Sequence, residues 1–253
     1  MNIAQEWLAL RVALQFLSCL PVTVREEITP ALWARSLLWY PAVGLIIGLL
    51  LWLACALLPE QLPALLGAAL LVALWVGLTG ALHLDGWADC VDAWVGGIGD
   101  RERTLAIMKD PRCGPMAVVA LVCLLLLKVS ALMALLLVGA GYWWLIPLLA
   151  RTLILPAFLQ LPYVRSEGLG SALAEHLPRR AAVISLLLSL ALLFLLLPFM
   201  VWLSWLLAAG LLFVGWRQVV MARLQGFTGD CVGALVAVAE VALLVVTALG
   251  VYQ

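Results

Sequence analysis

Residues 83–92 concentrate groups that could do chemistry in a chain with few charges. Asp85, Asp89 and Asp92 stand at positions i, i+4 and i+7, so a helix would bring them within roughly 60° of one another on one face. Three ionised carboxylates this close repel one another and need a divalent cation or open water. The spacing predicts a metal site at the three aspartates, with His83 as a general base or as a structural hydrogen-bond donor.

Three further segments each combine a carboxylate with glycine and have a basic residue within them or just before them. Carboxylates can hold Mg²⁺, cations can neutralise phosphate oxygens, and glycine lets the backbone approach a ligand. The combination predicts metal-dependent phosphoryl transfer, while each loop taken alone is also compatible with Gly and Asp residues that make turns. The residues concerned are Lys109, Asp110 and Arg112, then Arg165 and Glu167, then Thr228 and Asp230.

Composition places the chain in a membrane. Of its 253 residues, 66% are hydrophobic and 11% are charged, and the mean hydropathy is +1.18, whereas soluble domains carry about 25% charged residues. We therefore expect an integral membrane protein in contact with lipid. The formal net charge is zero and no basic stripe with interleaved aromatic residues is present, so nucleic acid is not expected as a partner.

Hydrophobic runs separated by polar turns predict an all-α, polytopic membrane helical bundle that forms a single domain over residues 1–253. Residues 5–20 alternate polar and apolar groups at helical spacing, which predicts an amphipathic or half-inserted first helix. We expect about seven transmembrane helices, with a range of six to eight because Pro198 could interrupt one broken helix. The expected spans are 36–58, 62–78, 116–138, 142–161, 181–197, 199–216 and 231–251.

Basic residues are distributed unequally between the two sides of this bundle. Twelve of the fourteen Lys and Arg residues lie at the N-terminal side or in the three long polar segments 79–115, 162–180 and 217–230. By the positive-inside rule these segments and the N-terminus are cytoplasmic, and the C-terminus is periplasmic. The aspartate-rich segment 79–115 would then be the catalytic segment.

Lys128, Arg151 and Glu240 are the charged residues expected within spans. A cation at a helix centre costs on the order of 2.5–3.5 kcal/mol, so each cation should face an anionic partner or an aqueous cavity. Glu240 is the candidate partner. A structural role inside the bundle and a role on a transport pathway both remain open at this point.

Two families share features with residues 79–92. The D-G-x-x-D-x-x-D pattern is similar to that of the CDP-alcohol phosphotransferases, but their Ala-Arg after D-G-x-x and their downstream pair of aspartates are absent. Four ordered motifs together resemble the cobalamin synthase family over nearly the whole chain. They are residues 79–89 (TGALHLDGWAD), 107–114 (IMKDPRCG), 165–170 (RSEGLG) and 228–234 (TGDCVGA).

The resemblance implies an adenosylcobinamide-GDP ribazoletransferase of the EC 2.7.8 class, which acts in the last steps of vitamin B12 biosynthesis. It implies joining of adenosylcobinamide-GDP to α-ribazole or its 5′-phosphate, release of GMP, and a location in a prokaryotic inner membrane, with other corrinoid-pathway enzymes as candidate partners. Mg²⁺ would be held by Asp85, Asp89 and Asp92. The phosphate and substrate contacts would come from Lys109, Arg112, Arg165, Glu167 and Thr228, and Asp110 and Asp230 would orient the nucleophile or add a second metal.

Two alternative functions predict different experimental results. An ion-coupled transporter would use Lys128, Arg151 and Glu240 on its pathway and would move a substrate across proteoliposomes without producing GMP. A CDP-alcohol phosphotransferase would release CMP. The identity of the released nucleotide therefore separates the three functions.

Overall fold

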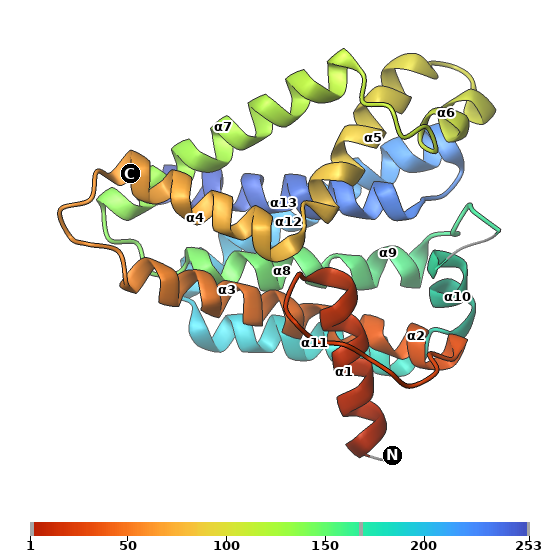
Figure 1. Cartoon of the computed structure of the whole chain (residues 1–253), viewed down its shortest axis with the longest axis horizontal. Helices are drawn as coiled ribbons and strands as arrows, with labels where there is room; N and C mark the ends of the chain where they lie inside the picture. The colour runs from red at the N-terminus through yellow and green to blue at the C-terminus, as the bar shows by residue number, and fades with distance from the viewer. Residues whose placement is uncertain (1–2, 167–168, 252–253) are drawn as a thin grey trace.

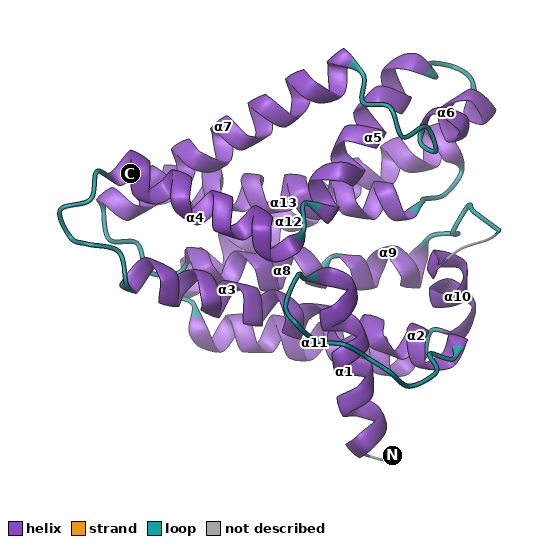
Figure 2. Cartoon of the chain, viewed as in Figure 1, coloured by secondary structure: helices purple, strands orange, loops and turns teal. Residues whose placement is uncertain are grey.

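The computed structural model describes residues 3–166 and 169–251 as helices joined by loops (Figures 1 and 2). In these two ranges no strand is present, and an isolated bridge pairs Tyr163 with Phe227. The predicted all-α class is confirmed. The helices are α1 (Ile3–Leu17), α2 (Pro30–Ser36), η1 (Leu37–Trp39), α3 (Tyr40–Ala56), α4 (Ala64–Thr79), α5 (Leu82–Gly96), α6 (Arg101–Ile107), α7 (Pro115–Leu137), η2 (Trp143–Leu145), α8 (Ile146–Thr152), α9 (Ile154–Gln160), α10 (Leu169–His176), α11 (Arg179–Leu196), α12 (Phe199–Leu224) and α13 (Gly229–Val251).

Six helical segments of the described chain are long and apolar enough to cross a membrane. The helices α4 and α5 pass the same test only as a pair, and they meet at a bend of 88°. Counting that pair as one span gives seven, which agrees with the number expected from the sequence. The six segments are Pro30–Ala56, Pro115–Leu137, Trp143–Gln160, Arg179–Leu196, Phe199–Leu224 and Gly229–Gly250.

Two helices extend beyond the spans expected from hydropathy. The first expected span starts earlier, because the Thr29 hydroxyl accepts a hydrogen bond from the Leu32 N–H at 3.3 Å and Pro30 opens α2. The expected span 199–216 is also longer in the structure. Its helix, α12, continues past residue 216 to Leu224, so most of the expected loop 217–230 is helical. Long Arg side chains allow this extension, since they reach polar partners from a helix that leaves the membrane.

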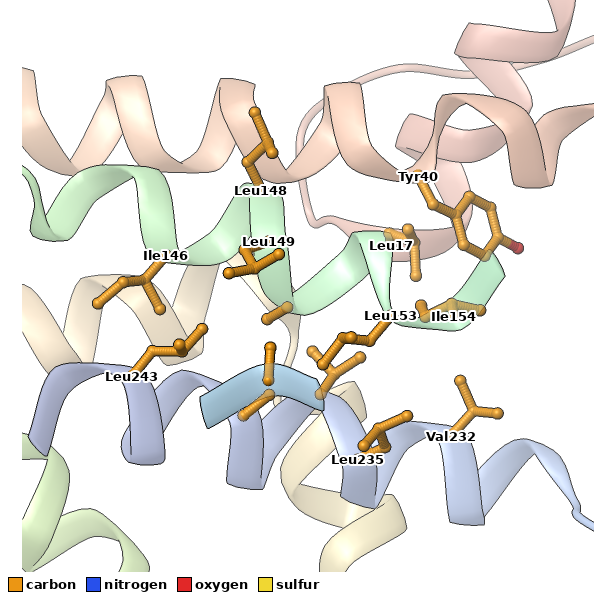
Figure 3. Close-up of a cluster of buried hydrophobic side chains, with 14 of the residues drawn as sticks. Leu17, Tyr40, Ile146, Leu148, Leu149, Leu153, Ile154, Val232, Leu235 and Leu243 are labelled. Atoms are coloured by element: carbon orange, nitrogen blue, oxygen red, sulfur yellow. The ribbon is translucent and has the colours of Figure 1, made fainter. Parts of the chain in front are cut away.

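The core lies where α3, α8, α9 and α13 face one another, as Figure 3 shows for side chains such as Leu149, Ile154 and Leu235. α3 approaches α8 closely because it presents glycine on two successive turns. A Cβ atom at Gly44 would lie 2.3 Å from the Pro147 carbonyl oxygen, and no side chain fits there. By contrast, α11 and α12 expose many leucines, which marks them as lipid-facing helices at the edge of the bundle.

The polar segments gather at one end of the bundle. Figure 1 shows α5, α6, α10 and the loop after α9 at the same end, whereas the turns after α3 and α7 and the C-terminal end of α13 lie at the other. The chain turns sharply between α4 and α5 because Gly80 and Ala81 both have a φ of 58°. This bend sends α5, with its aspartates, along the first turns of α13.

Candidate active site at the crossing of α5 and α13

Two glycines let α5 and α13 cross at the polar end of the bundle. A Cβ atom at Gly86 would lie 2.7 Å from the Asp230 carbonyl oxygen, and one at Gly233 would lie 3.4 Å from the Gly86 Cα. The glycine of the Asp85-Gly86 dipeptide therefore permits helix contact rather than a turn. The crossing places the α5 aspartates next to Asp230 at the start of α13.

Asp85 and Asp89 occupy one face of α5, one turn apart. The Asp85 side chain is exposed and Asp89 is half-buried. Asp230 lies against the same stretch of α5, since its carbonyl oxygen is 2.7 Å from the position of a Cβ atom on Gly86. Carboxylates that share a site repel one another, which is the condition in which a bound cation stabilises a cluster.

Asp92, the third predicted metal ligand, has other partners in this structure. Its Oδ2 accepts a hydrogen bond from the Gly114 N–H at 2.5 Å, and its Oδ1 accepts one from the Ala117 N–H at 2.9 Å. These N–H groups belong to the N-terminal end of α7, where the helix dipole favours an anion. Asp92 therefore links α5 to α7 and fixes the loop that follows α6.

No group of three His, Cys, Asp or Glu side chains is placed to hold a metal ion by itself within residues 3–166 and 169–251. This follows from the capping role of Asp92 and from the pairing of Asp230 with Arg165. Mg²⁺ is commonly held by one or two carboxylates together with water and substrate phosphates. Asp85 and Asp89 fit that donor set, and the prediction of a three-aspartate site stays a prediction.

Asp230 forms an ion pair with Arg165, at 2.6 Å between the carboxylate Oδ2 and Nη2. Thr228 caps α13 by accepting a hydrogen bond from the Cys231 N–H at 3.3 Å, and its hydroxyl donates to Asp230 Oδ2 at 3.4 Å. The Nε of Arg165 is buried and has no hydrogen-bond partner among the described residues. Arg165 is thus held beside the carboxylates with one donor free to bind an anionic group.

The loop that carries Arg165 is fixed to the start of α13 through its backbone. The Val164 N–H donates to the Phe227 carbonyl at 2.9 Å, and the Phe227 N–H donates to the Pro162 carbonyl at 3.1 Å. The Phe227 ring packs edge-on against Phe158 and Tyr163. Segments 65 residues apart in the sequence therefore position Arg165 and Asp230 together.

The residues after α6 lie on an exposed loop. Asp110 and Arg112 form a forked ion pair, with Nε to Oδ1 at 2.9 Å and Nη2 to Oδ2 at 2.5 Å. The Arg112 guanidinium holds the pKa of Asp110 down at about 2. Lys109 is exposed beside them. These three side chains do not line the cavity beside the crossing of α5 and α13. The loop that carries them is nevertheless held near α5, because the Gly114 N–H donates to Asp92.

A cavity of about 280 Å³ opens beside the crossing. Asp85, Asp230, Arg165 and His83 line it together with several aromatic and aliphatic side chains. His83 is buried in α5, one turn before Gly86, and lines the same cavity. Glu167 lies outside the described residues, while Leu169 and Gly170 of the same motif line the cavity.

The predictions from residue types and spacing missed the apolar side of this cavity. Tyr163 and Phe158 line it, yet the reasoning from charges and glycines had no means of selecting them. Tyr163 follows the expected span 142–161 by two residues, which is where aromatic residues commonly anchor a span end. The sequence therefore offered no signal that singled it out as a cavity residue.

The three charges expected within spans form one buried cluster. Glu240 accepts from Lys128 Nζ at 2.6 Å and from Arg151 Nη1 at 2.7 Å, and the Trp75 indole N–H donates to it at 3.2 Å. The Lys128 ammonium also lies 3.7 Å from the centroid of the Trp75 ring. The expected pairing with Glu240 is confirmed, and it joins α4, α7, α8 and α13.

Known proteins resemble this chain over nearly its whole length. A family model described as cobalamin-5-phosphate synthase matches residues 9–248. A protein of Ectopseudomonas mendocina named adenosylcobinamide-GDP ribazoletransferase is 55% identical over 248 residues, which covers 96% of this chain and 99% of that protein. Proteins of the same name from Pseudomonas entomophila and Pseudomonas aeruginosa are 55% and 54% identical, covering 94% and 95% of this chain and 97% and 98% of their own lengths. No solved structure matches. The chain therefore belongs to the cobalamin-5-phosphate synthase family.

Proposed function

We propose that this chain joins adenosylcobinamide-GDP to α-ribazole or α-ribazole 5′-phosphate, releasing GMP and forming adenosylcobalamin or its 5′-phosphate. The observation that carries the proposal is the gathering of Asp85, Asp230 and Arg165 at one cavity, with Asp89 one turn along α5. Carboxylates beside a guanidinium provide the charges that phosphoryl transfer requires. The family membership supplies the substrates.

In the proposed reaction, a ribose hydroxyl of ribazole bonds to the phosphorus that is attached to cobinamide. The bond from that phosphorus to the oxygen of GMP breaks, and GMP leaves with the electron pair. The nucleophile is a hydroxyl because the 5′-phosphate, where present, survives in the product. We assign the hydroxyl proton to His83 because this imidazole lines the cavity, and we assign Arg165, whose Nε has no partner among the described residues, to the phosphate oxygens.

Mg²⁺ is the proposed cofactor, and Asp85 and Asp89 are the side chains that would hold it. When bound, Mg²⁺ neutralises charge on phosphate oxygens. Asp92 supports the site from behind through α7, and Asp230 orients Arg165. Lys109 and Arg112 extend from the exposed loop beside the crossing, and we assign them to the nucleotide phosphates, where Arg112 would exchange its contact with Asp110 for a phosphate.

We also propose that the active-site end of the bundle faces the cytoplasm of a prokaryotic cell. The argument is the positive-inside rule, because the basic residues of the polar segments gather at that end. The N-terminus then lies on the cytoplasmic side and the C-terminus on the periplasmic side of the cytoplasmic membrane. Water-soluble nucleotides and other corrinoid-pathway enzymes would meet the protein at this face.

The identity of the released nucleotide tests the proposed function. Purified protein in lipid vesicles is supplied with Mg²⁺, α-ribazole and either adenosylcobinamide-GDP or a CDP-alcohol, and the nucleotide products are separated. We expect GMP from the first donor and no CMP from the second. Release of CMP, or uptake of a solute without any nucleotide product, would contradict the proposal.

A further inference from the structure

The cavity beside Asp230 has two chemically different sides. The charged and titratable groups come from α5, from the start of α13 and from the Arg165 loop. The opposite groups come from α1, α3, α9 and α10, and they are aromatic or aliphatic. Figure 3 shows Leu17 and Tyr40 next to each other above Ile154, with Val232 of α13 across from them. The apolar lining includes Phe16, Leu17, Tyr40, Ile154, Phe158 and Leu173.

The apolar side carries one buried polar atom that lacks a hydrogen bond of normal geometry. The Tyr40 side chain is only 2% exposed, and its hydroxyl lies near the Ser36 hydroxyl, which donates its own proton to the Trp33 carbonyl at 2.7 Å, without a well-formed bond to any described residue. A buried hydroxyl without a well-formed hydrogen bond costs free energy that a Phe at the same position would not cost. The ring is held in place by stacking on Phe16, at 6.2 Å between centroids and an angle of 28°. This arrangement is what a site needs if a ligand provides the missing acceptor.

The volume of the cavity indicates which part of the two substrates it can hold. At about 280 Å³ it lies near the small end of small-molecule pockets, which span about 300–1,000 Å³. A corrin macrocycle is far too large for it, whereas a nucleoside is of the right size. Of the two nucleosides involved, guanosine presents several donors and acceptors on its base, and the apolar side offers one hydroxyl without a well-formed hydrogen bond. The dimethylbenzimidazole base of α-ribazole presents two methyl groups and a single free ring nitrogen, which is an acceptor.

We propose that this cavity is the ribazole subsite, with the dimethylbenzimidazole base between Phe16 and Phe158 and the Tyr40 hydroxyl donating a hydrogen bond to its free ring nitrogen. The ribose then faces Asp85, Asp230 and Arg165, where its hydroxyl meets the phosphorus. The inference rests on the proposed function and adds a specificity-determining residue, Tyr40, that selects the incoming base. The corrinoid stays outside the cavity, with its pyrophosphate at the mouth.

Tyr40→Phe removes the hydroxyl and leaves the ring, so it tests the hydrogen bond directly. The matched control is Tyr142→Phe, at a Tyr that is 37% exposed and lies outside the cavity lining. Binding of two nucleosides to the protein in detergent is measured without the GDP donor: α-ribazole and the matching dimethylindole riboside, which lacks the acceptor nitrogen. Wild-type protein and Tyr142→Phe should bind α-ribazole about tenfold more tightly than the indole analogue, and Tyr40→Phe should bind both equally.

Two further readouts separate this inference from the proposed function and from misfolding. Tyr40→Phe should melt no lower than the wild type, because it removes a buried hydroxyl that has no well-formed hydrogen bond. In turnover it should raise the KM for α-ribazole about tenfold and leave the KM for adenosylcobinamide-GDP unchanged. If Tyr40→Phe still prefers α-ribazole over the indole analogue tenfold while GMP is released, the subsite assignment is wrong and the proposed function stands. If guanosine competes with α-ribazole for binding in the wild type but not in Tyr40→Phe, the cavity holds the donor base instead.

Discussion

At the scale of single residues, the α5 aspartates divide between two tasks. Asp85 lines the cavity, with Asp89 one turn along α5, while Asp92 caps α7 through Gly114 and Ala117. Their spacing of i, i+4 and i+7 made all three equivalent on a helical face. The partner that distinguishes Asp92 is a backbone N–H 22 residues away in sequence, and no local pattern could reveal it.

Asp92→Ala tests this division. We expect it to lower the free energy of unfolding by about 0.5–2 kcal/mol, because two N–H groups of α7 lose their acceptor. Chemical denaturation in detergent measures the change, and Asp92→Asn, which keeps one acceptor oxygen, should lose less. Unchanged stability in Asp92→Ala would show that the cap is not formed.

The carboxylates at the crossing predict an effect of Mg²⁺ on stability. We expect Asp89→Asn to melt above the wild type at pH 8 without divalent cations, because the substitution removes one of the carboxylates that repel one another there. Added Mg²⁺ at pH 8 should raise the melting temperature of the wild type alone. Identical melting curves at pH 8 would contradict the crowding of these carboxylates.

At the scale of helices, the site depends on the close crossing of α5 and α13. Gly86→Ala places a Cβ 2.7 Å from the Asp230 carbonyl oxygen, so the helices must separate. We expect a loss of about 1–3 kcal/mol in stability and a fall in turnover that exceeds the fraction unfolded, since Asp85 and Asp89 move relative to Asp230.

Gly77→Ala is the matched control, because a Cβ at this position of α4 meets no described atom within 4 Å. Ala favours a helix over Gly by about 0.5–1 kcal/mol, so this variant should be as stable as the wild type or slightly more so, with normal turnover. Equal effects of the two substitutions would show that the crossing distance is not limiting.

The buried cluster of Lys128, Arg151 and Glu240 joins α7, α8 and α13 through two cations and one anion. Glu240→Gln leaves both cations without a counter-charge, and we expect a loss of about 3–5 kcal/mol. Lys128→Met leaves the pair of Arg151 and Glu240 balanced and should cost less. Unfolding of both variants in the same detergent measures the order, and a larger loss in Lys128→Met would show that the counter-charge of Glu240 does not set the stability of the cluster.

At the scale of the whole molecule, hydropathy and charge were sufficient to predict a helical membrane bundle with its polar segments at one end. The same patterns did not predict that α12 runs on to Leu224, because its arginines lie within a regular helix and end in hydrogen bonds such as Arg223 Nη1 to the Trp94 carbonyl. They also did not predict the 88° bend between α4 and α5. Ala81 adopts a positive φ there, which is rare for a residue other than glycine, and its N–H caps α4 by donating to the Val76 carbonyl at 3.1 Å.

The candidate site, like the fold, could be predicted only in part from the sequence. Residue types predicted which side chains carry charge, and the structure brings Asp85, Arg165 and Asp230 together. It leaves the pair of Asp110 and Arg112 exposed on the neighbouring loop. The aromatic side of the cavity comes from α1, α3 and α9, whose apolar residues look like any others in a membrane protein. The charged residues of the site could therefore be predicted from the sequence, whereas the aromatic lining that gives the cavity its shape could not.

The most direct test of the whole account is GMP release by Asp89→Asn in lipid vesicles. The matched control is Glu60→Gln, in the loop between α3 and α4 at the opposite end of the bundle. With adenosylcobinamide-GDP, α-ribazole and Mg²⁺, we expect the wild type and Glu60→Gln to release GMP equally, and Asp89→Asn to release it at least about 100-fold more slowly while it inserts and melts as a folded protein. Near-normal GMP release by folded Asp89→Asn would contradict an active site at the crossing of α5 and α13.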